Sequence, residues 1–167
     1  MSDKNLLVSV FGKPNSGKTS TWCKLFGQTV KTGTKLRRLY LTSNEYVEVF
    51  LVSGSPEERG KKISDILPED SPRIVLCSIQ YADHADDTFN HFVSNGYQGL
   101  VQWLNPGFSD KKLYSDDLEF SEYLLSTNCF SLSQCEATSY KHLDDRVQKI
   151  REFIYGWAKF NNLLVQV

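Results

Sequence analysis

The sequence predicts an α/β fold in which helices cover a mostly parallel sheet that carries one antiparallel hairpin. Short apolar runs, typical of strands buried on both faces, alternate along the chain with segments of helical pattern. Two runs rich in β-forming residues, 36–42 and 46–52, are joined by a short polar segment, which indicates a hairpin. An amphipathic pattern over 143–160 indicates a helix that packs one face on the sheet.

Local patterns place the elements in order. The run LLVSVF at 6–11 is a strand that ends at Gly12, and a helix follows over 18–26 and stops near Gly27. After the hairpin, Pro56 with two acids behind it marks the start of another helix. The remaining expected elements are strands at 74–79, 100–104, 129–132 and 163–167, helices at 88–94 and 118–125, and a polar loop at 107–117.

The composition is that of an ordinary folded protein. Its 167 residues suit a single domain, 1–167, and 40% of them are hydrophobic. The 19 basic and 20 acidic residues nearly cancel, so binding to nucleic acid or to a membrane surface is not expected. The sequence lacks both a membrane-spanning run and a signal-peptide pattern. Four cysteines without a C-x-x-C pair indicate reduced thiols, and we expect a cytoplasmic protein.

One motif carries chemistry. Residues 12–19 read GKPNSGKT, a full match to G-x-x-x-x-G-K-[ST], between the first strand and the first helix. The glycines let backbone amides turn inward on phosphate oxygens, and the helix dipole adds positive potential. Lys18 would reach the β- and γ-phosphates, and the Thr19 hydroxyl would ligate Mg²⁺. The expected phosphate-binding residues are Gly12, Lys13, Pro14, Asn15, Ser16, Gly17, Lys18, Thr19 and Ser20.

On GKPNSGKT and its LLVSVF lead-in, the chain resembles the P-loop NTPase superfamily. The resemblance implies a three-layer P-loop NTPase-like fold that holds a nucleoside triphosphate and Mg²⁺ at residues 12–19. In layout the chain is most similar to small P-loop kinases, although the motif itself assigns no subfamily.

Patterns of other subfamilies are missing. Regulatory GTPases resemble one another in a D-x-x-G after the third strand and an N-K-x-D base reader after a later one. Here residues 53–56 read SGSP and residues 105–107 read NPG. ABC-type ATPases have an L-S-G-G-Q signature and a strand that ends in Asp-Glu, whereas strand 74–79 is followed by Gln80 and Tyr81. The missing guanine reader favours ATP over GTP.

Two further residues are candidates for catalysis beside Lys18. Arg59, which precedes two nearby lysines, would neutralise charge on a phosphoryl group during its transfer. The same charges also suit the solvent-exposed surface of a helix. Asp83 lies just past a strand end and is a candidate general base. The acids within 83–87 equally suit the first turn of a helix.

Two functions from different classes follow. The first is a Mg-ATP-dependent phosphotransferase or NTPase in which Lys18 stabilises charge on the γ-phosphoryl group. The second is a nucleotide-sensing module with little turnover, in which the nucleotide controls a surface for a protein partner. The first is the leading hypothesis. One feature favours the second, since no strand ends in a clear acid for Mg²⁺; the nearest acids after strands are Glu57 and Glu58, and then Asp83, Asp86 and Asp87. A structural protein with a vestigial loop would leave Lys18 and Thr19 without a purpose.

Overall fold

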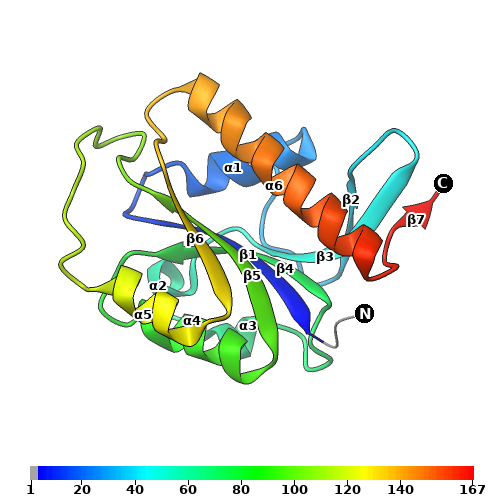
Figure 1. The fold of residues 1–167 in the computed structure, drawn as a ribbon, viewed down its shortest axis with the longest axis horizontal. Helices are drawn as coiled ribbons and strands as arrows, with labels where there is room; N and C mark the ends of the chain where they lie inside the picture. The colour runs from blue at the N-terminus through cyan, green and yellow to red at the C-terminus, as the bar shows by residue number, and fades with distance from the viewer. Residues whose placement is uncertain (1–3) are drawn as a thin grey trace.

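The sheet of the computed structural model lies between two layers of helices (Figure 1). The structure describes residues 4–167, so the first three residues of the expected domain lie outside it. Helices α1 and α6 cover one face, and α4 and α5 cover the other. The strands are β1 (Asn5–Gly12), β2 (Arg37–Tyr40), β3 (Glu45–Val52), β4 (Ile74–Gln80), β5 (Tyr97–Leu104), β6 (Phe130–Cys135) and β7 (Val165–Gln166). The helices are α1 (Lys18–Phe26), α2 (Pro56–Arg59), α3 (Ile63–Ile66), α4 (Ala85–Ser94), α5 (Phe120–Thr127) and α6 (Tyr140–Phe160).

Strand β1 lies in the middle of the sheet. The strand order over the described residues is β2-β3-β4-β1-β5-β6, and β1 is parallel to both β4 and β5. β3 pairs parallel with β4, and β6 pairs parallel with β5. Strands β2 to β4 therefore lie on one side of β1 and strands β5 and β6 on the other. The carboxyl ends of parallel strands at such a point typically border a ligand-binding crevice. Gly12 ends β1 at this border.

The predicted hairpin is confirmed at one edge of the sheet. β2 pairs antiparallel with β3, with Leu39 opposite Val47. The C-terminal strand is shorter than expected, because only β7 pairs, antiparallel with the first residues of β3, where Tyr46 lies opposite Val165. The sheet is thus mostly parallel, with antiparallel pairing confined to β2, β3 and β7 in the described chain.

Several element boundaries differ from the expectation: α4 begins at Ala85 and α6 at Tyr140, each three residues early, and three other differences have identifiable reasons. β5 starts at Tyr97 rather than at 100, because Gly99 (φ 154°) lets its backbone pass close to β1 within the ladder. β6 extends to Cys135, because an edge strand tolerates polar residues. The helix expected from Pro56 ends after one turn, and α3 follows as a second short helix.

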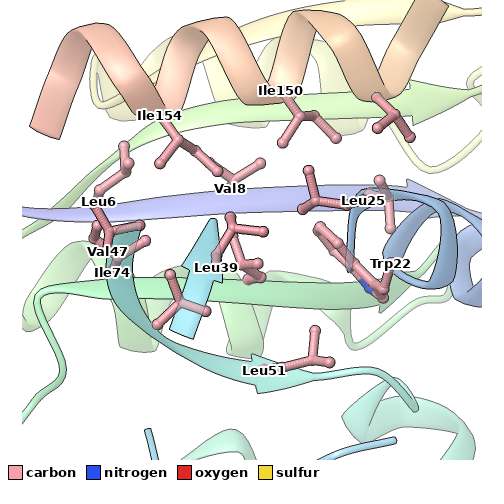
Figure 2. Close-up of a cluster of buried hydrophobic side chains, with 14 of the residues drawn as sticks. Leu6, Val8, Trp22, Leu25, Leu39, Val47, Leu51, Ile74, Ile150 and Ile154 are labelled. Atoms are coloured by element: carbon pink, nitrogen blue, oxygen red, sulfur yellow. The ribbon is translucent and has the colours of Figure 1, made fainter. Parts of the chain in front are cut away.

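Alternating side chains of β1 separate the two halves of the core. Leu6 and Val8 face α6, where Ile150 and Ile154 cover them (Figure 2). Trp22 of α1 packs in the same cluster and donates its indole N–H to Ser78 Oγ at 2.8 Å. The intervening positions, such as Leu7 and Phe11, face α4 and α5 in the second cluster. Both faces of β1 are therefore buried, as its continuous apolar sequence predicts.

Helix α6 is amphipathic, as its sequence predicts. Its apolar stripe contains Val147, Ile150 and Ile154, all buried against the sheet. The Ser139 hydroxyl caps its start by accepting a hydrogen bond from the backbone N–H of His142 at 3.3 Å. No helix among the described residues combines the length and the apolar composition that crossing a bilayer requires.

Candidate functional site

The loop of residues 12–19, which we call the 12–19 loop, folds back over the start of α1. Asn15 (φ 59°) and Gly17 (φ 109°) adopt left-handed backbone conformations there, and glycine tolerates such a φ best. The Lys18 ammonium group donates to the carbonyl oxygens of Gly12 at 3.1 Å and Lys13 at 2.9 Å. The first residues of the loop therefore close around the Lys18 ammonium group.

Lys18 is a buried cation with little opposing charge. Its exposed fraction is 6%, and its one ion pair among the described residues is with Glu58, 3.5 Å from Nζ to Oε1. The Glu58 side chain is 42% exposed, so solvent weakens this attraction. Burial lowers the pKa of Lys18, and the attraction of Glu58 opposes that shift only in part. An anionic ligand would supply the charge that the fold does not.

A cavity of about 280 Å³, which we call the phosphate cavity, opens over the 12–19 loop. Its lining is mainly polar. Five of the residues expected to bind phosphate line it, namely Asn15, Gly17, Lys18, Thr19 and Ser20. Four residues from outside the motif complete the lining, namely Ser53, Glu58, Phe108 and Ser109. The structure thus adds segments after β3 and after β5 to the motif.

The segment after β5 rests directly on the 12–19 loop. The backbone N–H of Phe108 donates to Ser16 O at 3.1 Å, and that of Ser109 donates to Asn15 O at 3.2 Å. A Cβ at Gly107 would lie 2.9 Å from Ser16 Cβ, so only glycine allows this approach without a shift. The first residues of the polar 107–117 loop are therefore fixed to the motif.

The far end of the same loop is held by Asn105. Its side-chain amide donates to Tyr114 O at 2.8 Å, and its Oδ1 accepts from Tyr114 N at 3.0 Å. The Tyr114 hydroxyl accepts from the indole N–H of Trp103, and Lys13 Nζ lies 4.0 Å from the centroid of the Tyr114 ring. Lys13 therefore faces an aromatic ring at the rim of the site and does not line the phosphate cavity.

Helix α2 carries two acids with separate roles. Glu57 accepts from the backbone N–H of Gln80 at 2.7 Å and from the Thr88 hydroxyl, which ties α2 to the end of β4 and to α4. Burial raises the pKa of Glu57, and these two hydrogen bonds oppose the shift. Glu58 instead lines the phosphate cavity beside Lys18. In the sequence, both acids can be identified as candidate Mg²⁺ ligands only from their position soon after the third strand.

The two other candidate catalytic residues lie elsewhere. Arg59 is exposed and lines a separate hollow together with Thr32 and Lys61. Asp83 is exposed just before α4 and is absent from the lining of the phosphate cavity. The structure therefore does not bring either side chain to Lys18. Pro14 is exposed and Ser16 is buried, and neither lines the phosphate cavity.

The donor set of the phosphate cavity fits Mg²⁺ bound together with phosphate. No group of three or more His, Cys, Asp or Glu able to hold a metal occurs within residues 4–167. Mg²⁺ in nucleotide sites usually keeps waters and uses one or two protein oxygens plus phosphate oxygens. The Thr19 hydroxyl and the Glu58 carboxylate both line the cavity and offer such oxygens.

Comparison with known proteins adds no family assignment. No family model matches this chain, and neither a curated protein nor a solved structure matches it.

Proposed function

We propose that the protein binds the triphosphate of a nucleoside triphosphate, with Mg²⁺, on the 12–19 loop, and that its fold is P-loop NTPase-like. The observation that carries the proposal is the buried Lys18 ammonium group at the start of α1, held by its own loop beside a polar cavity. A buried cation, a helix N-terminus and a loop with left-handed residues favour the same ligand, a polyphosphate.

The reaction class that this arrangement supports is phosphoryl transfer to an acceptor or to water. In it Lys18 stabilises the charge that develops on the γ-phosphoryl oxygens, because a fixed cation in a partly buried site acts strongly on nearby charge. Mg²⁺ would neutralise the β- and γ-phosphates when bound. Thr19 and Glu58 are the residues that would hold the ion. The phosphates then replace Glu58 as the partner of Lys18.

A second function, nucleotide sensing with little turnover, has a specific observation in its favour. Glu58 is the only acid in the lining of the phosphate cavity among the described residues, and it pairs with Lys18. Glu57, the next acid, is committed to Gln80 and Thr88. With no further carboxylate available to orient a nucleophile, slow chemistry is expected, and the bound state itself would be the signal that a protein partner detects.

Titration calorimetry with Mg-ATP and Mg-GTP, followed by phosphate-release assays, tests the proposal. We expect micromolar binding that Lys18→Ala abolishes, because no other buried cation among residues 4–167 lines the cavity. Lys24→Ala is the matched control: Lys24 is on the same helix, but it is solvent-exposed and pairs with Asp144. Binding unaffected by Lys18→Ala, or no binding by the unaltered protein, would overturn the proposal. Phosphate release that Lys18→Ala removes favours the enzyme, and binding without release favours the sensor.

A further inference from the structure

A second cavity adjoins the phosphate cavity at the 12–19 loop. The two share Gly17, Ser20 and Phe108, and the second adds Ala137, Tyr140 and Arg146 to its lining. Ser53 and Glu58 of the phosphate cavity follow β3, whereas Ala137 and Tyr140 follow β6, and these strands lie on opposite sides of β1. The second cavity therefore lies on the β6 side of the motif, whereas the phosphate cavity also reaches the β3 side.

This placement fixes the direction of a bound nucleotide. Glu58, the acid proposed to face Mg²⁺, follows β3, and its Oε1 lies 3.5 Å from Lys18 Nζ, so the proposed sites for the β- and γ-phosphates and Mg²⁺ are toward the β3 side. The remainder of the nucleotide, beyond its α-phosphate, must then extend past Gly17 and Ser20 toward the β6 side. The second cavity measures about 60 Å³, which accommodates the edge of a planar ring. The aromatic side chains of Phe108 and Tyr140, 39% and 74% exposed, extend it outward, with ring centroids 5.7 Å apart.

Arg146 is the unexplained group in this cavity. It is 4% exposed, and it forms no ion pair with a carboxylate among the described residues. Its Nη2 donates to the Thr21 hydroxyl at 2.8 Å, while its Nε is buried without a hydrogen-bond partner in the described chain. Burial lowers the pKa of Arg146, which shows how poorly the fold compensates its charge. A buried guanidinium with spare donors favours a ligand with acceptor atoms.

The surroundings of Arg146 strengthen this preference. The cavity lining contains no carboxylate within the described residues, and α6 begins at Tyr140, so a second positive dipole end lies at the same place. A guanidinium can only donate hydrogen bonds. The O6/N7 edge of guanine offers two acceptors, whereas the matching edge of adenine offers one acceptor and one amino donor.

We propose that the cavity around Arg146 seats the base of the nucleotide and that its donor-only guanidinium selects a 6-oxopurine, guanine or hypoxanthine, over adenine. This inference rests on the proposed function. It reverses the preference for ATP that the missing N-K-x-D pattern suggests, because an arginine from α6 supplies a different reader. Phe108 and Tyr140 provide the aromatic surface for the flat faces of the ring.

Competition binding with Mg-GTP, Mg-ITP, Mg-ATP and Mg-tripolyphosphate tests the inference. We expect GTP and ITP to bind at least about tenfold more tightly than ATP, in line with one good bidentate contact. Arg146→Met should bring the three affinities within about threefold of one another and leave tripolyphosphate binding unchanged. Equal affinities in the unaltered protein, or a GTP preference that survives in a folded Arg146→Met protein, would overturn it.

Arg146 also joins α6 to α1, so its replacement can impair folding, which circular dichroism and thermal melting would show. Tyr140→Ala is the second variant, because its side chain is mostly exposed. It should weaken GTP and ITP binding several-fold without changing tripolyphosphate binding, whereas Phe160→Ala, an exposed aromatic at the far end of the same helix, should change neither. Unchanged GTP binding in Tyr140→Ala would contradict binding of the base in the cavity around Arg146. Loss of tripolyphosphate binding in Lys18→Ala tests the proposed function separately, so the two failures are distinguishable.

Discussion

At the scale of single residues, the site is defined by cations whose charge the fold only partly compensates. Lys18 is held by two neutral carbonyl groups and one exposed carboxylate. Arg146 has a hydroxyl as its hydrogen-bond acceptor in the described chain. Both pKa values are lowered, and in both cases burial is the largest cause. Such groups cost stability in the empty protein and become favourable when an anion or an acceptor binds.

The lowered pKa of Lys18 predicts a pH dependence of stability. As the pH rises through the lowered pKa of the folded state toward the usual value of 10.5, the unfolded chain holds more protons on this lysine than the folded chain does. The free energy of unfolding should therefore rise with pH in this window. Urea denaturation at several pH values would show a steeper rise for the unaltered protein than for Lys18→Met. Parallel pH profiles for the two proteins would contradict the assignment of Lys18 as a buried charge.

Replacing Glu58 separates its two roles. Glu58→Gln removes the acid that competes with phosphate for Lys18, so nucleotide binding in the presence of EDTA should strengthen. The same change removes a carboxylate oxygen from Mg²⁺, so the enhancement of binding by Mg²⁺ should fall by about tenfold or more. Calorimetry with and without Mg²⁺ measures both effects. Glu122→Gln, an exposed acid on α5, is the control and should change neither. A uniform change in both conditions would show that Glu58 does not face the metal.

At the scale of elements, the site depends on how the segment after β5 sits on the 12–19 loop. Gly107 passes Ser16 so closely that an added Cβ would lie 3.0 Å or less from its Cα and Cβ atoms. These are a backbone atom and the side-chain atom bonded to it, so the contact cannot relax by rotation of a flexible side chain. The conformation of the motif is therefore coupled to a loop nearly one hundred residues later in the sequence.

Gly107→Ala is expected to weaken nucleotide binding and to destabilise the protein by about 1–3 kcal/mol, the usual cost of overpacking. Urea denaturation and nucleotide titration would measure the two effects. Gly156→Ala on α6 is the matched control, because a Cβ there meets no atom within 4 Å, and alanine favours helix. It should leave binding unchanged and stabilise the protein by about 0.5–1 kcal/mol. Equal effects of the two substitutions would show that the contact at Gly107 is unimportant.

The sequence predicts the elements whose signals are local. The first strand, the loop after it and α1 follow from one motif and one apolar run, and α6 follows from its periodicity. β6 extends beyond the predicted strand 129–132, because an edge strand needs no continuous apolar pattern. α3 was missed, because a single helical turn carries almost no periodic signal.

The candidate site is predictable only in its contiguous part. The residues 12–20 are found from the motif, but Glu58 and Phe108 reach the phosphate cavity through the packing of other elements. Arg146 gave one usable signal, since it lies between Leu143 and Val147 on the buried stripe of α6, where a charged residue is unexpected. Its partner Thr21 cannot be identified from sequence, because the contact spans 125 positions.

At the scale of the whole molecule, a ligand that binds only the folded chain must raise its stability. At one hundred times the dissociation constant, the gain is about 2.7 kcal/mol, which thermal melting detects readily. Mg-nucleotide should therefore shift the melting temperature of the unaltered protein and of Lys24→Ala, and not that of Lys18→Ala. No shift in the unaltered protein at saturating nucleotide would contradict binding to the folded state.

The position of helix α6 has a consequence for folding during synthesis. Arg146 contacts Thr21, and Arg151 donates to the carbonyl oxygen of Leu25 at 2.7 Å, so the last long helix buttresses the first. A chain growing on the ribosome exposes its glycine-rich motif long before α6 is synthesised, so these contacts form only after α6 has emerged. Competence to capture a ligand should therefore arise only at that stage, and nascent chains that stop before Tyr140 should remain inert.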